Sequence, residues 1–226
     1  MEIGGRFYGS LSSPELCPPT KPAAVFCPTQ KRALSPKKTK SSSIANDFHA
    51  RIVSVRKPRQ LQDDARYHVT ARANRKEMIF DPDPVKELFL SVIKRAHRKY
   101  DFRIENFCVM GNHFHLIIQP RNGANLSAIM QWIMSVFAMA YNRRRGITGH
   151  VWGNRFFSRI IDSLNDFLKI FDYIDSNPVR ANQVTDPWDW SHGGLAHARK
   201  GRRDIIEEPQ EWICWLFPLH KVLELA

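Results

Sequence analysis

The spacing of apolar and polar positions changes several times along the chain, and each change indicates a different element. Apolar residues alternate with polar ones over residues 65–73, which predicts a strand with one buried side. Two apolar-rich runs, 102–110 and 113–119, are separated by Gly111-Asn112, a pair typical of a hairpin turn. One more short strand is expected over residues 156–162.

In three other segments, apolar residues recur every three to four positions, which is the pattern of a helix with one buried face. The first helix is expected to start at Asp83, because the proline that follows fits the first helical turn. Asn125 is a typical N-cap for the second helix, which should end before Gly146, and Ser163 is a typical N-cap for the third. The apolar stretch 212–225 is expected to dock as a further helix.

The resulting order is strand, helix, strand, strand, helix, strand and a further helix. It predicts an α+β fold, a ferredoxin-like split β-α-β sandwich in which an antiparallel sheet carries helices on one face. One folded domain is expected over residues 60–192. Residues 1–59 hold seven of the 14 prolines and a Lys/Ser-rich stretch, so they predict a disordered basic arm. Residues 193–226 are expected to form a C-terminal extension that is helical in part.

Charge changes this picture more than composition does. The 226 residues carry a formal net charge of +12, which suits a polyanionic partner. Residues 1–60 hold 11 Lys and Arg against three acids, so the alternative is that a solvated basic tail accounts for the excess. No apolar run approaches the roughly 20 residues of a membrane span, and the N-terminal residues lack the apolar core of a secretory signal. Four cysteines without zinc-finger spacing indicate a reduced cytoplasmic protein with no membrane partner.

The first candidate for chemistry is the run His113-Phe114-His115 within a predicted strand. Side chains of successive strand residues point to opposite faces, so both imidazoles share one face while Phe114 points into the core. Two neutral imidazoles side by side can chelate a divalent cation. The alternative is that this short pattern has arisen by chance, since two histidines alone are a weak signal.

The second candidate is Tyr173, in the helix that follows Ser163. On a helical wheel it falls nearly opposite the apolar stripe, which consists of Leu164, Phe167, Leu168, Phe171 and Ile174. Its hydroxyl is therefore expected to be free for another role. Asn177 lies one turn later on the same side, although Pro178 leaves open that Asn177 merely ends the helix.

Three runs, CVMGNHFHLIIQP, GHVWGNRFFSRIIDS and YIDSNPVRANQV, resemble the signatures of the REP-associated tyrosine transposases. These belong to the single-tyrosine HUH (His-hydrophobic-His) transposases of bacterial insertion sequences. The similarity covers about residues 61–192. The chain departs from the usual family pattern at Gly111, where proline is common, and at Ala73, where glycine is common; neither position carries a reactive group.

The resemblance implies a function for each candidate residue. His113 and His115 would hold Mg²⁺ or Mn²⁺, with Asn177 as third ligand, and Tyr173 would be the nucleophile. The activity implied is metal-dependent nicking and rejoining of single-stranded DNA through a 5′-phosphotyrosine intermediate, on hairpin or palindromic DNA. Residues 60–192 would then be the catalytic domain. Two imidazoles suit Mn²⁺ better than Mg²⁺, although Mg²⁺ is the more abundant ion in cells.

Several arginines are candidates for binding DNA phosphates. Arg155 and Arg159 flank the predicted strand at 156–162, and both are expected to reach the backbone. Arg143 and Arg144 could do the same, or could simply favour the C-terminal end of the helix dipole. Arg180 could contact a phosphate or form a local salt bridge.

Two other functions remain open at this stage. The same sheet could bind hairpin DNA or RNA without cutting it, although binding alone does not need the histidines and Tyr173. A zinc hydrolase is a weaker alternative, because no HExxH motif or third regularly spaced histidine is present. The chain leaves undecided whether it is a monomer or a homodimer in which two protomers exchange the tyrosine helix. A bacterial, cytoplasmic and nucleoid-associated location is expected.

Overall fold

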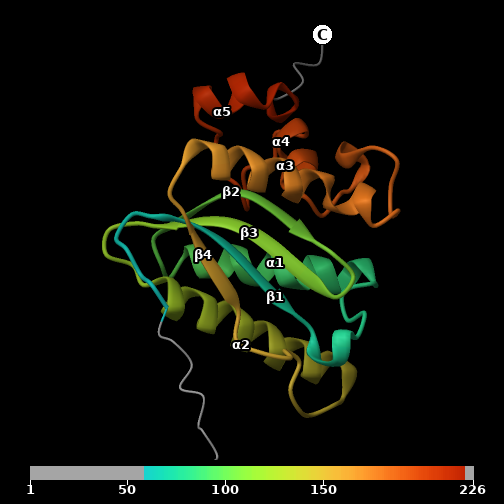
Figure 1. Cartoon of the computed structure of the whole chain (residues 1–226). Helices are drawn as coiled ribbons and strands as arrows, with labels where there is room; N and C mark the ends of the chain where they lie inside the picture. Colours follow the sequence, from blue (N-terminus) through green and yellow to red (C-terminus); the bar gives the residue numbers. More distant parts are fainter. Residues whose placement is uncertain (1–58, 222–226) are drawn as a thin grey trace, which may run out of the picture. The chain divides into compact units, whose positions relative to one another are not determined.

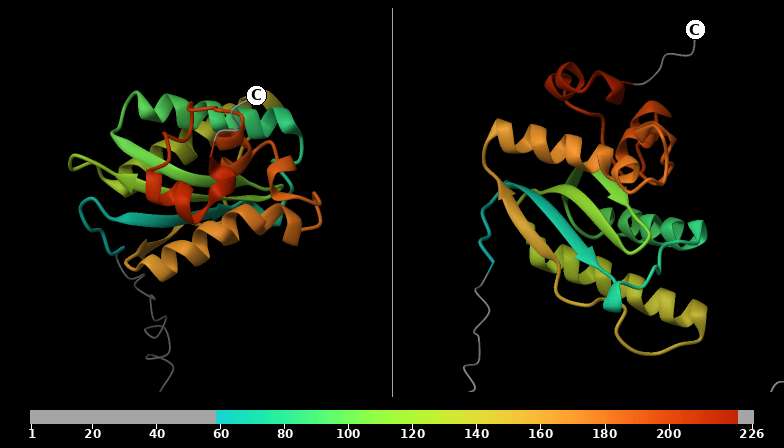
Figure 2. Two further views of the ribbon diagram at one scale, coloured as in Figure 1. Left: turned by 90° about the horizontal axis from the view of Figure 1, so that it is seen from above. Right: turned by 45° about the vertical axis from the view of Figure 1, so that its right-hand side comes forward.

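The computed structural model describes residues 59–221, which form a four-stranded sheet with helices on both faces (Figures 1 and 2). The basic arm predicted for residues 1–59 lies, apart from Arg59, outside the described residues. The strands are β1 (Arg66–Arg72), β2 (Phe102–Val109), β3 (His113–Pro120) and β4 (Phe157–Ile161). They are arranged in the order β2-β3-β1-β4, and all neighbours are antiparallel. This arrangement confirms the predicted ferredoxin-like sheet.

Two helices, α1 (Asp83–His97) and α2 (Leu126–Arg145), cover one face of the sheet (Figure 2). Their ends confirm the sequence signals: the Asn125 side chain accepts a hydrogen bond from the Ala128 amide at 3.1 Å, and Gly146 ends α2 with φ 64°. Such a left-handed conformation favours glycine. The core between helices and sheet is built largely from fully buried aromatic rings, among them Phe89, Phe114 and Phe137.

The other face of the sheet is covered by α3 (Leu164–Arg180) (Figure 1). The helix begins as predicted, with the Ser163 hydroxyl accepting a hydrogen bond from the Asp166 amide at 3.1 Å. The expected placement of helices on one face thus holds for α1 and α2, and α3 adds a third layer. The buried side of α3 differs from the predicted stripe, because Leu164 is 58% exposed and Ile170 is buried. The side of α3 that contacts the sheet is therefore centred closer to Ile170 than the predicted stripe, which did not include this residue.

The chain beyond α3 contains α4 (Gly194–Arg199), α5 (Glu211–Leu216) and three-residue 3-10 helices at Pro187–Asp189 and Pro218–His220; a similar turn, Asn74–Lys76, follows β1. The helix predicted over residues 212–225 is interrupted at Phe217, and residues 222–225 of that prediction lie outside the described residues. Helix α5 ends at Leu216 because Pro218 disfavours helical geometry at Phe217, whose φ is −126° and ψ 76°. Within residues 59–221, none of the helices is long and apolar enough to cross a membrane.

Candidate active site

The two histidines of the HFH run lie on the face of β3 that α3 covers. Their ring centroids are 5.0 Å apart and the rings are nearly perpendicular. Burial, followed by the charge of Arg72, lowers the pKa of His113 to about 4. Burial is also the main reason why the pKa of His115 is lowered to about 3, with smaller contributions from His113, His68 and Arg72. Both rings are therefore neutral at pH 7, the form in which imidazole binds a metal ion.

The orientation of the His113 ring is set by its neighbour Asn112. The Asn112 amide nitrogen donates a hydrogen bond to the Lys76 carbonyl oxygen at 3.1 Å, which turns Asn112 Oδ1 toward His113 Nδ1, 2.7 Å away. Since this oxygen only accepts, the His113 proton is on Nδ1. The lone pair of His113 is consequently on Nε2, the nitrogen available to a ligand.

His115 is 5% exposed, and its contacts differ from those of His113. His115 Nδ1 lies 3.0 Å from Nε2 of His68, a β1 residue whose ring stacks on it with a centroid separation of 5.3 Å. His115 Nε2 is buried and has no hydrogen-bond partner among the described residues. A buried polar atom without a partner is unusual in a folded protein. This nitrogen is therefore suited to coordinate a metal ion bound at the site.

Tyr173 projects from α3 toward these histidines. Its ring is nearly perpendicular to that of His115, with centroids 5.3 Å apart, and the residue is 36% exposed. It therefore lies beside the buried side of α3, and the prediction that it points nearly opposite that side is wrong. Tyr67 and Tyr141 are buried in the core beneath the other face of the sheet.

Arg180, one of the predicted DNA contacts, lies near this tyrosine. Its guanidinium carbon is 5.5 Å from the centroid of the Tyr173 ring. The guanidinium group of Arg180 thus lies beside the aromatic ring of Tyr173. The role of Arg180 toward DNA stays a prediction.

Asn177 is buried one turn after Tyr173, and α3 continues through Pro178 to Arg180, so Asn177 does not end the helix. Among residues 59–221, no three His, Cys, Asp or Glu side chains gather into a metal site. An ion held by His113 and His115 would therefore need an amide oxygen, such as that of Asn177, or oxygens from substrate and water. The assignment of Asn177 as third ligand stays a prediction.

The C-terminal segment, residues 211–221, packs against α3. Phe217 stacks on Phe171 with ring centroids 4.3 Å apart, and His220 Nε2 donates to Asp175 Oδ2 at 2.8 Å. The other Asp175 oxygen accepts a hydrogen bond at 2.9 Å from the buried Asn106 of β2. Asp175 thus links the C-terminal segment to the sheet beneath the tyrosine helix.

Replacing His220 by alanine is expected to lower the free energy of unfolding by about 2 kcal/mol, because a partly buried carboxylate oxygen of Asp175 loses its donor and Phe171 loses a packing partner. Chemical denaturation of the full chain measures this difference. His150→Ala, at an exposed position outside the site, is the matched control. A loss no greater than that of the control would show that the contact does not hold α3.

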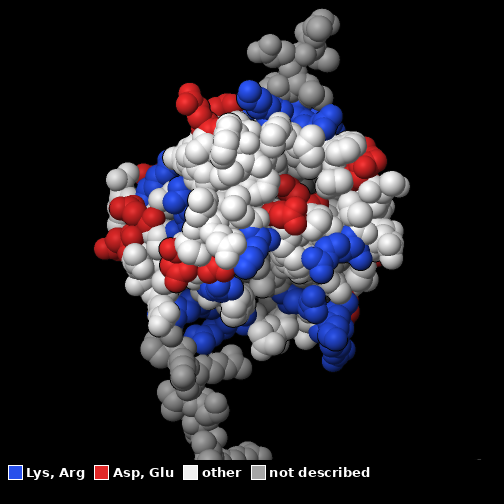
Figure 3. Space-filling view, turned by 45° about the horizontal axis from the view of Figure 1, so that its top comes forward, with Lys and Arg blue, Asp and Glu red and all other residues white. Residues whose placement is uncertain are grey.

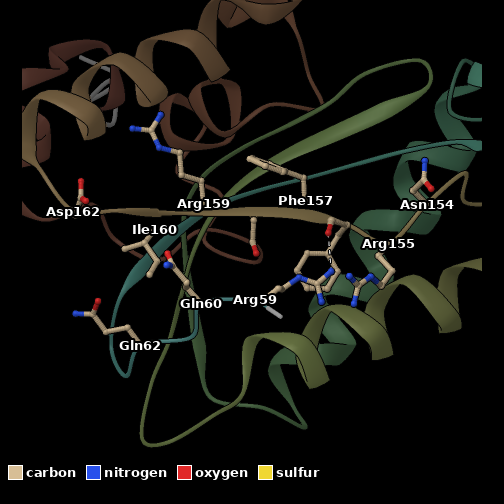
Figure 4. A pocket seen from close by; sticks show the side chains of 11 residues that line it. Arg59, Gln60, Gln62, Asn154, Arg155, Phe157, Arg159, Ile160 and Asp162 are labelled. Carbon is tan, nitrogen blue, oxygen red and sulfur yellow. Dashed lines mark hydrogen bonds between the residues drawn. The ribbon is translucent and has the colours of Figure 1, made fainter. Parts of the chain in front are cut away.

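The other four arginines predicted to bind DNA divide into two groups. Arg155 and Arg159 line a groove of about 930 Å³ along β4, together with Arg59, as Figure 4 shows. Phe157 is 57% exposed in the same groove. Arg159 also forms an ion pair with Asp166 at 2.7 Å.

Arg143 and Arg144 form the second group and lie elsewhere. Both are exposed in the last turn of α2, in the helix layer on the opposite face of the sheet from α3. They do not line the groove along β4. Their position in the last turn of α2 is compatible with the helix-dipole explanation, and DNA binding by Arg143 and Arg144 stays a prediction.

Three residues at the site were not predicted from the sequence. Arg59 stacks on Phe156 and donates a hydrogen bond to the Phe156 carbonyl oxygen at 2.7 Å, but it had been placed in the arm. Asn112 had been interpreted only as a turn residue. From the sequence, His68 is only a polar position in the strand. Its place on the face of β1 that carries the imidazole pair becomes a signal for the site only once the pairing of β1 with β3 is known.

Comparison with known proteins supports the resemblance seen in the three runs. A family model described as "Transposase IS200 like" matches residues 62–177. A Haemophilus influenzae protein assigned as a REP-associated tyrosine transposase is 26% identical over 136 residues, which cover 55% of this chain and 74% of that protein.

The fold is similar to that of a solved structure described as a REP-associated tyrosine transposase bound to a REP hairpin. The TM-score is 0.55 at 21% identity, and the match covers 68% of this chain and 89% of that one. Since the family model spans half of the chain and includes His113, His115, Tyr173 and Asn177, the chain belongs to the IS200-like transposase family.

Proposed function

We propose that this protein nicks and rejoins single-stranded DNA beside a hairpin, with Tyr173 as the nucleophile. The observation that carries the proposal is the contact between the rings of Tyr173 and His115, which brings a phenol against a pair of neutral imidazoles on one face of the sheet. Hairpin DNA is proposed as substrate because the similar solved structure is described as bound to a REP hairpin.

A divalent ion, Mg²⁺ or Mn²⁺, fits the residues present. The unpartnered Nε2 of His115 and the Nε2 lone pair of His113 would hold it, with Asn177 as the third ligand. When bound, such an ion neutralises charge on the scissile phosphate and orients it for in-line attack. Burial of the two rings keeps them neutral, which is the form that binds a metal ion.

The side chains of this chain supply the other parts of the reaction. The Tyr173 oxygen forms a bond to the phosphorus, the bond between phosphorus and the 3′-oxygen breaks, and the 3′-oxygen takes up a proton to become a hydroxyl. A phenol is mostly protonated at neutral pH, so its proton passes to water or another base as attack occurs. Attack of a 3′-hydroxyl on the phosphotyrosine rejoins the strand and restores Tyr173.

The surface near the site suits a polyanion. Basic side chains lie at the lower left and the lower right of the face shown in Figure 3, with acidic side chains beside those on the left. The groove along β4 combines arginines with the exposed ring of Phe157, and this combination suits a single strand, since arginines contact phosphates and aromatic rings stack on bases.

The proposal is tested with end-labelled oligonucleotides that carry a hairpin flanked by single strands, incubated with the full chain and Mn²⁺ or Mg²⁺. The expected result is a cut strand with a free 3′-hydroxyl and a protein-linked 5′-phosphate that survives denaturing electrophoresis. Tight hairpin binding with no cut strand under either ion would contradict the proposal and favour a binding module that does not cut.

Two substitutions separate the contributions of the groove along β4. Arg155→Ala should reduce the slope of log affinity against log salt by about 0.7, the value for one phosphate contact on a single strand. Phe157→Ala should weaken binding about tenfold at every salt concentration, because a stacked base loses its platform. Fluorescence anisotropy across a salt series measures both effects.

The control for the groove is Arg98→Ala, which removes an exposed arginine just after α1, outside the groove. It should leave the affinity nearly unchanged apart from a small loss at low salt. Equal effects of Arg98→Ala and Arg155→Ala would mean that the groove along β4 does not hold the single strand.

A further inference from the structure

His68 is brought to the imidazole pair by the register of the sheet. On β1, the residue directly across from His115 is Thr70, and His68 is two positions away on the same face. The His68 ring spans this distance by stacking on His115 at an interplanar angle of 18°. Its Nε2 reaches His115 Nδ1 at 3.0 Å, which is hydrogen-bonding distance.

Two arrangements of protons allow this hydrogen bond. In the first, His115 Nδ1–H donates to a bare His68 Nε2, and His115 Nε2 carries a lone pair. In the second, His68 Nε2–H donates, and the proton of His115 is on its own Nε2. The second arrangement buries an N–H group of His115 that has no acceptor among the described residues. A buried nitrogen without a partner is costly whether it carries a proton or a bare lone pair, and only the bare lone pair of the first arrangement can be satisfied by a bound metal ion, so the first arrangement is the one that fits the proposed site.

The favoured arrangement places the lone pair of His115 where Asn112 places that of His113. In each ring, Nδ1–H donates a hydrogen bond, which leaves Nε2 bare. The two acceptors come from different parts of the fold, His68 from β1 and Asn112 from the turn before β3. In both histidines, a hydrogen bond donated by Nδ1–H thus leaves the Nε2 lone pair available to the ion.

We propose that His68 is a positioning residue, which accepts the Nδ1 proton of His115 and thereby fixes this ring with its Nε2 lone pair available to the metal ion. This inference rests on the proposed function, because it assigns His115 Nε2 to the ion. Contacts of this kind to a ligating histidine fix its tautomer and its ring orientation, and their loss typically weakens metal binding.

The tautomer of His115 is tested directly in the metal-free protein. Proton–nitrogen correlation spectra of the full chain with isotope-labelled histidine distinguish a protonated Nδ1 from a protonated Nε2. The wild type should show His115 protonated on Nδ1, and His68→Ala should shift the proton toward Nε2. Protonation on Nε2 in the wild type would overturn the inference, whatever the protein does to DNA.

Metal affinity supplies a second measurement, made by calorimetric titration of the full chain with Mn²⁺ in the absence of DNA. His68→Ala should weaken binding about 10- to 100-fold. His68→Gln should keep most of the affinity, because its Oε1 can accept the same proton, and its retained affinity would also show that the effect is not one of misfolding. His150→Ala, which removes a histidine outside the site, should bind as the wild type does.

The outcomes separate this inference from the proposed function. If the wild type binds Mn²⁺ and His68→Ala binds it equally well, His68 has no positioning role and the proposed function stands. If the wild type binds no Mn²⁺ while His115 carries its proton on Nδ1, the hydrogen bond is as inferred, but the metal step of the proposed function fails and the role of His68 toward an ion fails with it.

Discussion

Tyr173→Phe is expected to abolish the covalent protein–DNA product and to reduce strand cleavage by a factor on the order of 10⁴ or more, as removal of a nucleophile typically does. Only the hydroxyl is lost, so the packing of the ring against His115 is retained. The melting temperature and the affinity for hairpin DNA should stay close to those of the wild type. Denaturing electrophoresis of labelled DNA measures the covalent product.

The other tyrosines provide the control for this substitution. Tyr67 and Tyr141 are buried in the core on the other face of the sheet, so neither can reach a DNA phosphate without unfolding. Tyr141→Phe should therefore leave the covalent product unchanged. A covalent product from Tyr173→Phe at the wild-type yield would assign the nucleophile to another residue.

Loss of the imidazole pair is expected to have the second large effect. His113→Ala combined with His115→Ala should lower the cleavage rate by a factor on the order of 10³ or more, because several kcal/mol of charge stabilisation at the phosphate are lost. Affinity for DNA should fall little, since the groove along β4 and its arginines are unchanged. Cleavage and anisotropy measured on the same DNA separate the two effects.

Removing metal from the wild type with EDTA is the matched experiment without a mutation, and it avoids the cavity that two alanines leave beneath α3. Activity should disappear and should return when Mn²⁺ is added in excess. Cleavage that continues undiminished in EDTA would contradict a metal-dependent mechanism, even if the double variant is inactive through misfolding.

Local signals in the sequence were enough to predict most of the sheet and its helices. The Asn125 and Ser163 caps, the left-handed Gly146 and the hairpin at Gly111-Asn112 each act within a few residues, so they can be interpreted without knowing the fold. The strand order followed from the order of elements, because the split β-α-β pattern is compatible with few topologies.

Features that depend on packing between distant segments could not be predicted in the same way. The wheel of α3 gave the wrong side for Tyr173, because contacts with Cys108 and Ile117 decide which residues of that helix are buried. The contact of His68 with His115 requires the register between β1 and β3, and no spacing within β1 indicates it. The sequence does not distinguish Arg143 and Arg144 from Arg155 and Arg159. Only the position of α2 in the fold shows that the first two lie away from the groove along β4.

The order of β4 in the chain has a consequence for how the protein folds. Strands β1, β2 and β3 can pair before β4 has been synthesised, but one edge of β1 then has unpaired backbone groups. An open strand edge is a site for aggregation. Strand β4, which is synthesised after α2, pairs with that edge of β1, forms a wall of the groove and leads directly into α3 with Tyr173. A chain that terminates before residue 157 therefore lacks the fourth strand, the β4 wall of the groove and Tyr173 together, although it still contains the imidazole pair on β3.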